Sequence, residues 1–124
     1  MARILIADDR PENRLLVATV LQHAGHTVFE AADGAEALAQ AAAHRPDLAL
    51  IDLSLPGTKG TEVIRALRAR PQTASVAIAL YTASAVHPAL RDFMELYGIE
   101  HIVPKPAEPA ELLAAVQAAL AAGR

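Results

Sequence analysis

The sequence predicts an α/β domain in which a parallel five-stranded sheet is covered by helices on both faces. Five short apolar runs alternate with five segments of helical spacing along the 124 residues, and this alternation is typical of a parallel sheet with helical crossovers. The length favours one hydrophobic core. The hydrophobic residues, 53% of the chain with an excess of alanine, favour helices around that core. We therefore expect one domain over residues 1–124, with its core between about 3 and 120.

Strands are predicted where apolar residues follow one another, and helices where they recur at helical spacing. The predicted strands are 3–7, 26–30, 48–52, 76–81 and 99–103, and the helices that follow them are 11–24, 33–44, 58–70, 88–97 and 108–120. The strand that ends at Asp52 is apolar on both faces. This pattern predicts a place in the middle of the sheet.

Local residues justify the ends of the first two helices. Pro11 suits the first turn of a helix, with Asp9 or Arg10 near its cap. The residues that carry the helical spacing are Leu15, Leu16, Thr19, Val20 and His23. In the second helix, Asp33 is the expected cap and Glu36 is placed for a capping box.

The third and fourth helices have equally local signals. Either Thr58 or Thr61 is placed to cap the third helix, which ends before Pro71. We interpret the basic end of this helix as a solvated face near the negative pole of the helix dipole; its residues are Arg65, Arg68 and Arg70. In the fourth helix we interpret three residues at helical spacing as core: Phe93, Met94 and Tyr97.

Composition argues against several classes of function. A net charge of −3 does not favour a nucleic-acid-binding surface. Without cysteine the chain has no disulfide and no thiolate metal site, and its five histidines show no paired ligand spacing. Residues 1–7 do not form a signal peptide, and no run is apolar enough to span a membrane. We expect a cytoplasmic domain without nucleic-acid or membrane partners.

Polar residues stand at the ends of four predicted strands: Asp8 and Asp9, Asp52, Thr82, and Lys105. Parallel strands place these ends at one edge of the sheet. Carboxylates 4 Å apart repel by about 4 kcal/mol at an effective dielectric of 20, and Mg²⁺ would relieve this repulsion. Asp52 could then attack phosphorus as a nucleophile. Lys105 would neutralise phosphoryl oxygens and the Thr82 hydroxyl would donate to another.

Each of these residues also has a simpler interpretation when taken alone. The acidic pair before Pro11 suits a helix cap, and Asp52 suits a turn. Thr82 suits a helix cap, and Lys105 suits a solvated surface, although prolines flank it on both sides. Caps and turns do not predict three aspartates, one threonine and one lysine at four strand ends. The combination favours the phosphoryl-transfer hypothesis.

The same residues lie in motifs that resemble those of response-regulator receiver domains. The matching residues are Asp8-Asp9, Asp33-Gly34 with Glu36-Ala37-Leu38, Asp52 with Leu55, Pro56 and Gly60 in Asp-x-x-Leu-Pro-x-x-x-Gly, Thr82-Ala83, and Lys105-Pro106. The resemblance covers the chain from about Arg3 to Leu120. It implies a (βα)5 fold of the flavodoxin-like type, with sheet order 2-1-3-4-5.

The resemblance also implies a role for each site residue. Asp52 would be the phosphoacceptor. Asp9 would bind Mg²⁺ (or Mn²⁺) directly, Asp8 would bind it through water, and the backbone carbonyl of Ser54 would be a further ligand. Lys105 would contact the phosphoryl oxygens, and the bond to the proline that follows it would be a cis peptide.

The implied function is that of a phosphoacceptor receiver in a two-component phosphorelay. It is not an enzyme beyond supporting its own phosphotransfer and autodephosphorylation. The donor would be a histidine kinase or a histidine phosphotransfer protein, docked on the first helix at Asn13, Arg14 and Val17. The signal would pass to a downstream protein or to a covalently linked output domain.

Two positions matter for how such a switch would work. Ile102 stands where the family has an aromatic residue, three before the lysine, so the aromatic half of the family's switch is missing. Ser54 and Ser84 occupy positions that tune dephosphorylation in the family.

Three alternatives remain. One is a pseudo-receiver or interaction module of a multidomain or hybrid signalling protein that acts without phosphorylation. A flavin module is disfavoured because the acidic pair after the first strand would repel its phosphate. An aspartyl phosphohydrolase is disfavoured because it needs an acid where Ser54 stands.

Overall fold

The computed structural model describes residues 1–83 and 86–122, and in this part of the chain strands and helices alternate as predicted. The strands are β1 (Arg3–Ala7), β2 (Thr27–Ala31), β3 (Leu48–Ile51), β4 (Ala77–Thr82) and β5 (His101–Pro104). The helices are α1 (Pro11–His23), α2 (Gly34–His44), α3 (Gly60–Ala69), α4 (Pro88–Leu96) and α5 (Pro109–Ala122). The predicted bounds agree with these or differ by at most two residues, as the ends of elements commonly do.

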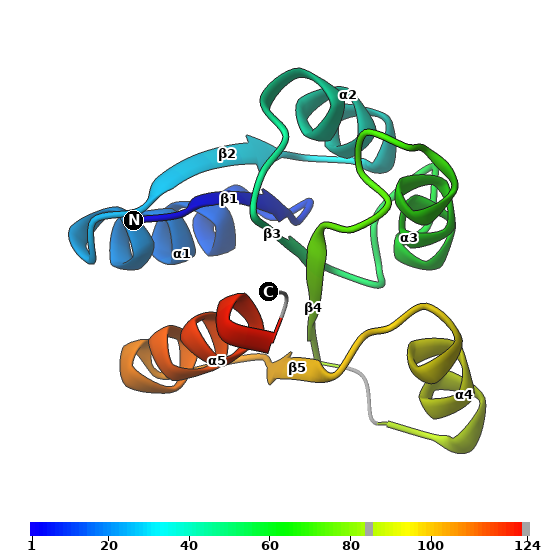
Figure 1. The fold of residues 1–124 in the computed structure, drawn as a ribbon. Helices are drawn as coiled ribbons and strands as arrows, with labels where there is room; N and C mark the ends of the chain where they lie inside the picture. Colours follow the sequence, from blue (N-terminus) through cyan, green and yellow to red (C-terminus); the bar gives the residue numbers. More distant parts are fainter. Residues whose placement is uncertain (84–85, 123–124) are drawn as a thin grey trace.

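The strands form one parallel sheet with the order β2-β1-β3-β4-β5, which confirms the predicted topology (Figure 1). The central strand β3 is buried along its whole length, as its apolar sequence predicted. Ile51 pairs with Ala7 on one side and with Leu80 on the other. This register brings the carboxyl ends of β1, β3 and β4 to the same edge.

Helices cover both faces of the sheet (Figure 1). On one face α2, α3 and α4 enclose a core that includes Ile64, Leu67 and Met94. On the other face α1 and α5 enclose a second core that includes Leu21 and Val116. The sheet therefore separates two apolar layers, and polar groups at the strand ends lie between them at the rim.

The buried face of α1 does not include the leucines that carry its helical spacing. Val17, Ala18 and Leu21 are its buried residues, whereas Leu15 is 67% and Leu16 is 52% exposed. The small side chain of Ala18 suits a helix that lies close against the sheet, and this places the larger leucines on the outer face. Spacing alone did not distinguish these two faces of the helix.

The cap of α2 is confirmed, and the predicted cap of α3 is wrong. Asp33 Oδ1 accepts a hydrogen bond of 2.8 Å from the Glu36 N–H, and the Glu36 carboxylate accepts one of 2.9 Å from the Ala32 N–H. The cap of α3 is Lys59, without a side-chain hydrogen bond, and neither Thr58 nor Thr61 holds that position. Here the backbone serves instead, because the N–H of Gly60 donates to the carbonyl of Leu53 at 3.4 Å.

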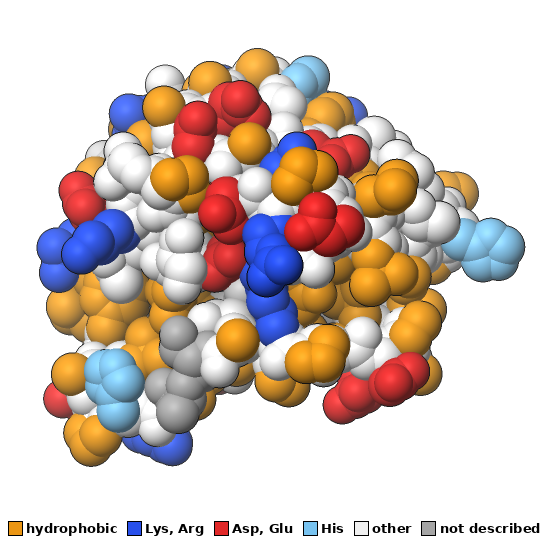
Figure 2. All heavy atoms as spheres, turned by 180° about the vertical axis from the view of Figure 1, so that it is seen from behind, with side chains coloured by type: hydrophobic (Ala, Val, Ile, Leu, Met, Phe, Trp, Pro, Cys, Tyr) orange, Lys and Arg blue, Asp and Glu red, His pale blue; other side chains and the backbone are white. Residues whose placement is uncertain are grey.

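The surface is mixed in character. Figure 2 shows acidic and basic side chains next to one another near the middle of one face, with hydrophobic side chains between and around them. Among the helices in residues 1–83 and 86–122, none has both the length and the apolar character that a membrane span requires.

Candidate functional site at the carboxyl ends of the strands

Four strands deliver the predicted site residues to one rim. Asp8 follows β1, Asp52 follows β3, Thr82 is the last residue of β4, and Lys105 follows β5. The backbone N–H of Asp8 donates to the carbonyl of Ala31, and that of Asp52 donates to the carbonyl of β1's last residue. These bonds continue the sheet by one step, so the carboxylates stand on rigid backbone.

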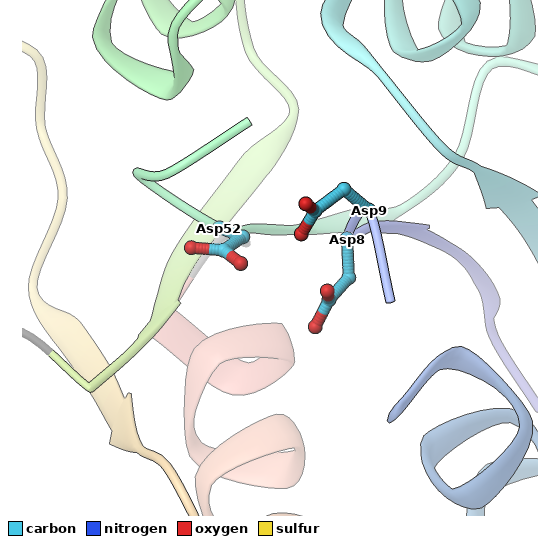
Figure 3. Close-up of side chains that lie close together, drawn as sticks. All are labelled: Asp8, Asp9 and Asp52. Carbon is cyan, nitrogen blue, oxygen red and sulfur yellow. The ribbon is translucent and has the colours of Figure 1, made fainter. Parts of the chain in front are cut away.

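Three carboxylates lie together at this rim (Figure 3). Asp8, Asp9 and Asp52 each offer an oxygen, and these oxygens lie within 4.8 Å of one another. Asp8 is 0% exposed and Asp52 is 4% exposed, whereas Asp9 is exposed to solvent. The site thus has two buried carboxylates and a third, from Asp9, that is exposed to solvent but points toward the other two (Figure 3).

Lys105 joins the two buried carboxylates. Its Nζ lies 2.6 Å from Asp8 Oδ2 and 2.7 Å from Asp52 Oδ2. Burial alone would lower the pKa of Lys105, but the hydrogen bonds to Asp52 and Asp8 outweigh this effect, and the pKa lies above the ordinary lysine value of 10.5. The ammonium therefore stays charged at neutral pH.

The backbone around Lys105 is also held in place. Its N–H donates to the carbonyl of Thr82 at 3.1 Å, which joins the ends of β4 and β5. The peptide bond between Lys105 and Pro106 is cis, as the resemblance implied. The hydrogen bond to Thr82 fixes the backbone from which the lysine stem reaches across the rim.

The other oxygens of the buried carboxylates accept local backbone hydrogen bonds. Asp8 Oδ1 accepts from the N–H of Arg10 at 3.0 Å, and Asp52 Oδ1 accepts from the N–H of Ser54 at 2.9 Å. Arg14 donates to the backbone carbonyl of Asp8 at 2.7 Å. Both buried carboxylates are thus compensated at each oxygen, which is what burial of a charge requires.

The glycine of the Asp-x-x-Leu-Pro-x-x-x-Gly motif has a packing role. A Cβ added at Gly60 would lie 2.5 Å from the carbonyl oxygen of Asp52 and 2.7 Å from Cα of Leu53. The first turn of α3 therefore lies directly against the backbone of the site. Only a residue without a side chain allows this approach without displacing the loop.

A pocket of about 530 Å³ opens beside the carboxylates, and Tyr81 lines it although the sequence interpretation missed this residue. Its ring centroid lies 4.8 Å from Lys105 Nζ. Burial raises the pKa of Tyr81, so its hydroxyl is neutral at physiological pH. The signal in the sequence was an aromatic residue directly before Thr82 at the end of an otherwise aliphatic strand.

Thr82 is buried at the end of β4, with 2% of its surface exposed. The cap interpretation of this residue is wrong, because α4 begins several residues later and its cap is His87, whose Nδ1 accepts from the N–H of Leu90 at 3.2 Å. Ala83 lines the pocket, and Ser84 lies outside the described residues.

Arg65 and Arg70 are exposed, as interpreted for the basic end of α3, but Arg68 is half-buried, which corrects the interpretation for this residue. Its guanidinium donates to three backbone carbonyls, those of Ala74, Val76 and Tyr97. Burial lowers the pKa of Arg68 below its ordinary value. The helix dipole suggested a solvated position, but the segments that carry these three carbonyls cover part of the side chain.

Three further expectations have clear outcomes. Met94 is buried, and Phe93 and Tyr97 pack against the same core, as predicted. His101 is the first residue of β5, at the end of the strand away from the site, as expected of a residue that lines the strand. Val17 is buried, so its place in the predicted docking surface for the phosphodonor is wrong.

A family model described as the response regulator receiver domain matches residues 4–117. The chain is 35% identical over 117 residues to the phosphate regulon transcriptional regulatory protein PhoB of Pseudomonas aeruginosa, covering 94% of this chain and 51% of PhoB. It is 30% identical over 121 residues to the protein PilH of the same species, covering 98% and 99%. The chain therefore spans about half the length of PhoB and nearly the whole of PilH.

A solved structure of the Vibrio cholerae chemotaxis protein CheY4 is also similar. It superimposes with a TM-score of 0.89 and is 34% identical, covering 96% of this chain and 98% of that one. The sheet order and the family match thus agree with each other.

Proposed function

The chain belongs to the family of response-regulator receiver domains, and from this premise we propose that it is a phosphoacceptor switch in a two-component phosphorelay. Asp52 is the residue that receives the phosphoryl group. The observation that supports this assignment is its position: a carboxylate at the end of the central strand, 2.7 Å from the Lys105 ammonium and grouped with Asp8 and Asp9. A nucleophile for phosphoryl transfer needs such positioning and charge compensation.

The chemistry follows from the groups at the rim. The Asp52 carboxylate attacks phosphorus, an O–P bond forms as the P–N bond to the donor imidazole breaks, and the imidazole leaves with a proton from solvent. The hydrogen bond from the Ser54 N–H orients the attacking carboxylate. Lys105 turns toward the phosphoryl oxygens and offsets their charge. Thr82 lies between Tyr81 and Ala83, which both line the pocket, and its hydroxyl donates to another phosphoryl oxygen.

The donor atoms at the rim fit a hard divalent cation. The three carboxylates offer oxygen ligands only, which Mg²⁺ and Mn²⁺ prefer. Together with the Lys105 ammonium they carry a formal charge of −2, which a divalent cation balances. Asp9 and Asp52 would hold the ion, with Asp8 through water and the Ser54 carbonyl as a further ligand. When bound, the ion supplies positive charge at the transferring group.

The surface beside the pocket suits docking of the phosphohistidine donor. Asn13 and Leu16 of α1 line the pocket together with Pro106 and Ala107 of the loop before α5. Leu16 is 52% exposed, so it offers apolar contact area to a partner directly beside the polar groups of the site. We propose that a helix of a histidine kinase or a phosphotransfer protein binds here and brings its imidazole to Asp52.

Phosphorylation would add charge at Asp52, beside Lys105 and Thr82 at the ends of β5 and β4, and so bias the surface that these two strands support. Ile102 on β5 is half-buried against the core of α3 and α4. Because Ile102 stands where the family has an aromatic residue, the signal reaches a downstream protein or a linked output domain without the aromatic movement of the family's switch.

The test is the intact mass of the protein after incubation with acetyl phosphate, with and without Mg²⁺. The wild type is expected to gain one phosphoryl group only with Mg²⁺, and Asp52→Asn is expected to gain none while its circular dichroism spectrum is unchanged. A wild type that gains no mass would favour the alternative of an interaction module that acts without phosphorylation. Labelling of Asp52→Asn on another aspartate would overturn the assignment.

A further inference from the structure

The Lys105 ammonium has three contacts, and the third is aromatic. Nζ donates hydrogen bonds to Asp8 Oδ2 at 2.6 Å and to Asp52 Oδ2 at 2.7 Å. Its third contact is the ring of Tyr81, whose centroid lies 4.8 Å from Nζ. A cation this close to an aromatic ring is attracted by the negative charge on the ring face.

The ring is held rigidly at this place. Tyr81 lies in β4, pairs with Val103 of β5, and is 4% exposed. Its side chain belongs to the core that α1 and α5 cover. Because strand pairing and core contacts hold the ring, it offers the ammonium a fixed surface rather than a mobile one.

A role in the core alone does not require an aromatic residue here. The positions that precede Tyr81 on β4, from Ala77 to Leu80, are all aliphatic. The whole chain has two tyrosines, two phenylalanines and no tryptophan, and one of these few rings faces the site lysine. An aliphatic side chain of similar volume would fill the core but would give the ammonium no attractive surface.

We propose that Tyr81 is a positioning residue for phosphoryl transfer, because its ring face holds the Lys105 ammonium where it reaches a phosphoryl group on Asp52. This inference rests on the proposed function of Asp52. The ring face attracts the cation but accepts no strong directional hydrogen bond. The lysine is therefore kept near the site and remains free to turn from the carboxylates to the phosphoryl oxygens.

Two substitutions separate the ring from its hydroxyl. Tyr81→Leu removes the ring face and keeps an apolar side chain, whereas Tyr81→Phe keeps the ring and removes the hydroxyl. Tyr97→Leu is the matched control, because Tyr97 is the other tyrosine and packs on Phe93, with ring centroids 4.7 Å apart, in the core on the opposite face of the sheet. Melting temperatures of all three variants report the loss of packing separately.

The first measurement is the rate of phosphorylation by acetyl phosphate with Mg²⁺. From the strength of a partly desolvated cation–π contact, we expect Tyr81→Leu to be slower by about tenfold and Tyr81→Phe to recover the rate to within about twofold of the wild type. Tyr97→Leu should lose stability without losing this rate.

The second measurement is spectroscopic and needs no phosphodonor. The chain has two lysines, Lys59 and Lys105, so labelled lysine shows two sets of ε-methylene signals in a proton–carbon spectrum. The ring should shift the Lys105 protons upfield in the wild type and in Tyr81→Phe. This shift should be lost in Tyr81→Leu, with Lys59 as the internal reference.

The outcomes separate this inference from the proposed function. If the wild type is labelled and Tyr81→Leu is labelled equally fast, the inference is wrong and the proposed function stands. It is also wrong if Tyr81→Phe is as slow as Tyr81→Leu, or if the Lys105 shift is the same in all variants. If the wild type is not labelled at all, the proposed function is wrong, and the role of Tyr81 in that reaction falls with it.

Discussion

The Lys105 ammonium lies 2.6 Å from Oδ2 of Asp8, a carboxylate with no exposed surface, although the two residues are 97 positions apart in the chain. They follow β5 and β1, which are not neighbours, because β3 and β4 lie between them in the sheet. The pair therefore spans the rim of the site, with Asp52 between its two ends. Removing the Lys105 ammonium would leave the charges of two buried carboxylates, those of Asp8 and Asp52, without their compensating cation.

We therefore expect Lys105→Ala to lower the free energy of unfolding without Mg²⁺ by roughly 2 kcal/mol, less than for fully enclosed pairs because the pocket admits water. Urea unfolding measures this loss. Lys59→Ala is the matched control, since Lys59 is exposed. Equal stability of the two variants would show that the buried carboxylates do not need the ammonium.

A second prediction concerns Asp9 and Mg²⁺. Mg²⁺ at a concentration of one hundred times its dissociation constant should stabilise the wild type by about 2.7 kcal/mol. Asp9→Asn should lose most of this gain but fold normally without the ion, because Asp9 is exposed. Urea midpoints with and without Mg²⁺ measure the effect. Asp92→Asn, an exposed aspartate in α4, should keep the full gain. If Asp9→Asn kept it too, Asp9 would not be a ligand.

A third prediction concerns Arg68. Arg68→Met keeps the apolar stem but leaves the carbonyls of Ala74, Val76 and Tyr97 without their donor. We expect a loss of about 3 kcal/mol in the free energy of unfolding, because hydrogen bonds from a charged group are among the stronger ones. Arg70→Met, at an exposed position, should change the urea midpoint little. Similar midpoints for the two variants would contradict the structural role.

A fourth prediction is a pH dependence that arises from His26. Its Nδ1 accepts a hydrogen bond of 3.0 Å from the N–H of Ala2, and partial burial lowers the pKa of His26 from its ordinary 6.5. As the pH falls, His26 is therefore protonated in the unfolded chain at a higher pH than in the folded chain. The free energy of unfolding should therefore fall as the pH decreases through this window.

His26→Gln removes the titrating group and keeps an acceptor near Ala2. Its stability should fall less than that of the wild type when urea unfolding is compared between about pH 7.5 and about pH 5. His23→Gln, at an exposed position of α1, should follow the wild type. Parallel pH profiles for all three proteins would exclude His26 as the cause.

Much of the fold was predictable because its signals are local. Apolar runs and helical spacing located all ten elements to within one or two residues, and Asp33 with Glu36 predicted the start of α2. The predicted cap was wrong at α3, where no threonine side chain caps the helix. The carbonyl of Leu53 accepts a hydrogen bond from a backbone N–H of the first turn instead. Such a bond depends on how a loop folds back, which residue type does not report.

Burial was predicted wrongly at positions where it depends on which other element packs against the helix. The residues that carry the helical spacing of α1 include Leu15 and Leu16, which are exposed. Both faces of this helix carry apolar residues, and contact with the sheet decides which face is buried. Arg68 is half-buried because its guanidinium binds the carbonyls of Ala74 and Tyr97, which belong to other segments. In both cases the deciding contacts come from residues distant in sequence.

The sequence by itself determined the order of the elements and the residues at each strand end, because both follow from local periodicity and from parallel connections. It thereby grouped Asp8, Asp9, Asp52, Thr82 and Lys105 at one rim. Only the tertiary structure decided that Lys105 joins both buried carboxylates and that Tyr81 lies beside its ammonium. These contacts depend on sheet order, register and the reach of one side chain across the rim, which no local pattern encodes.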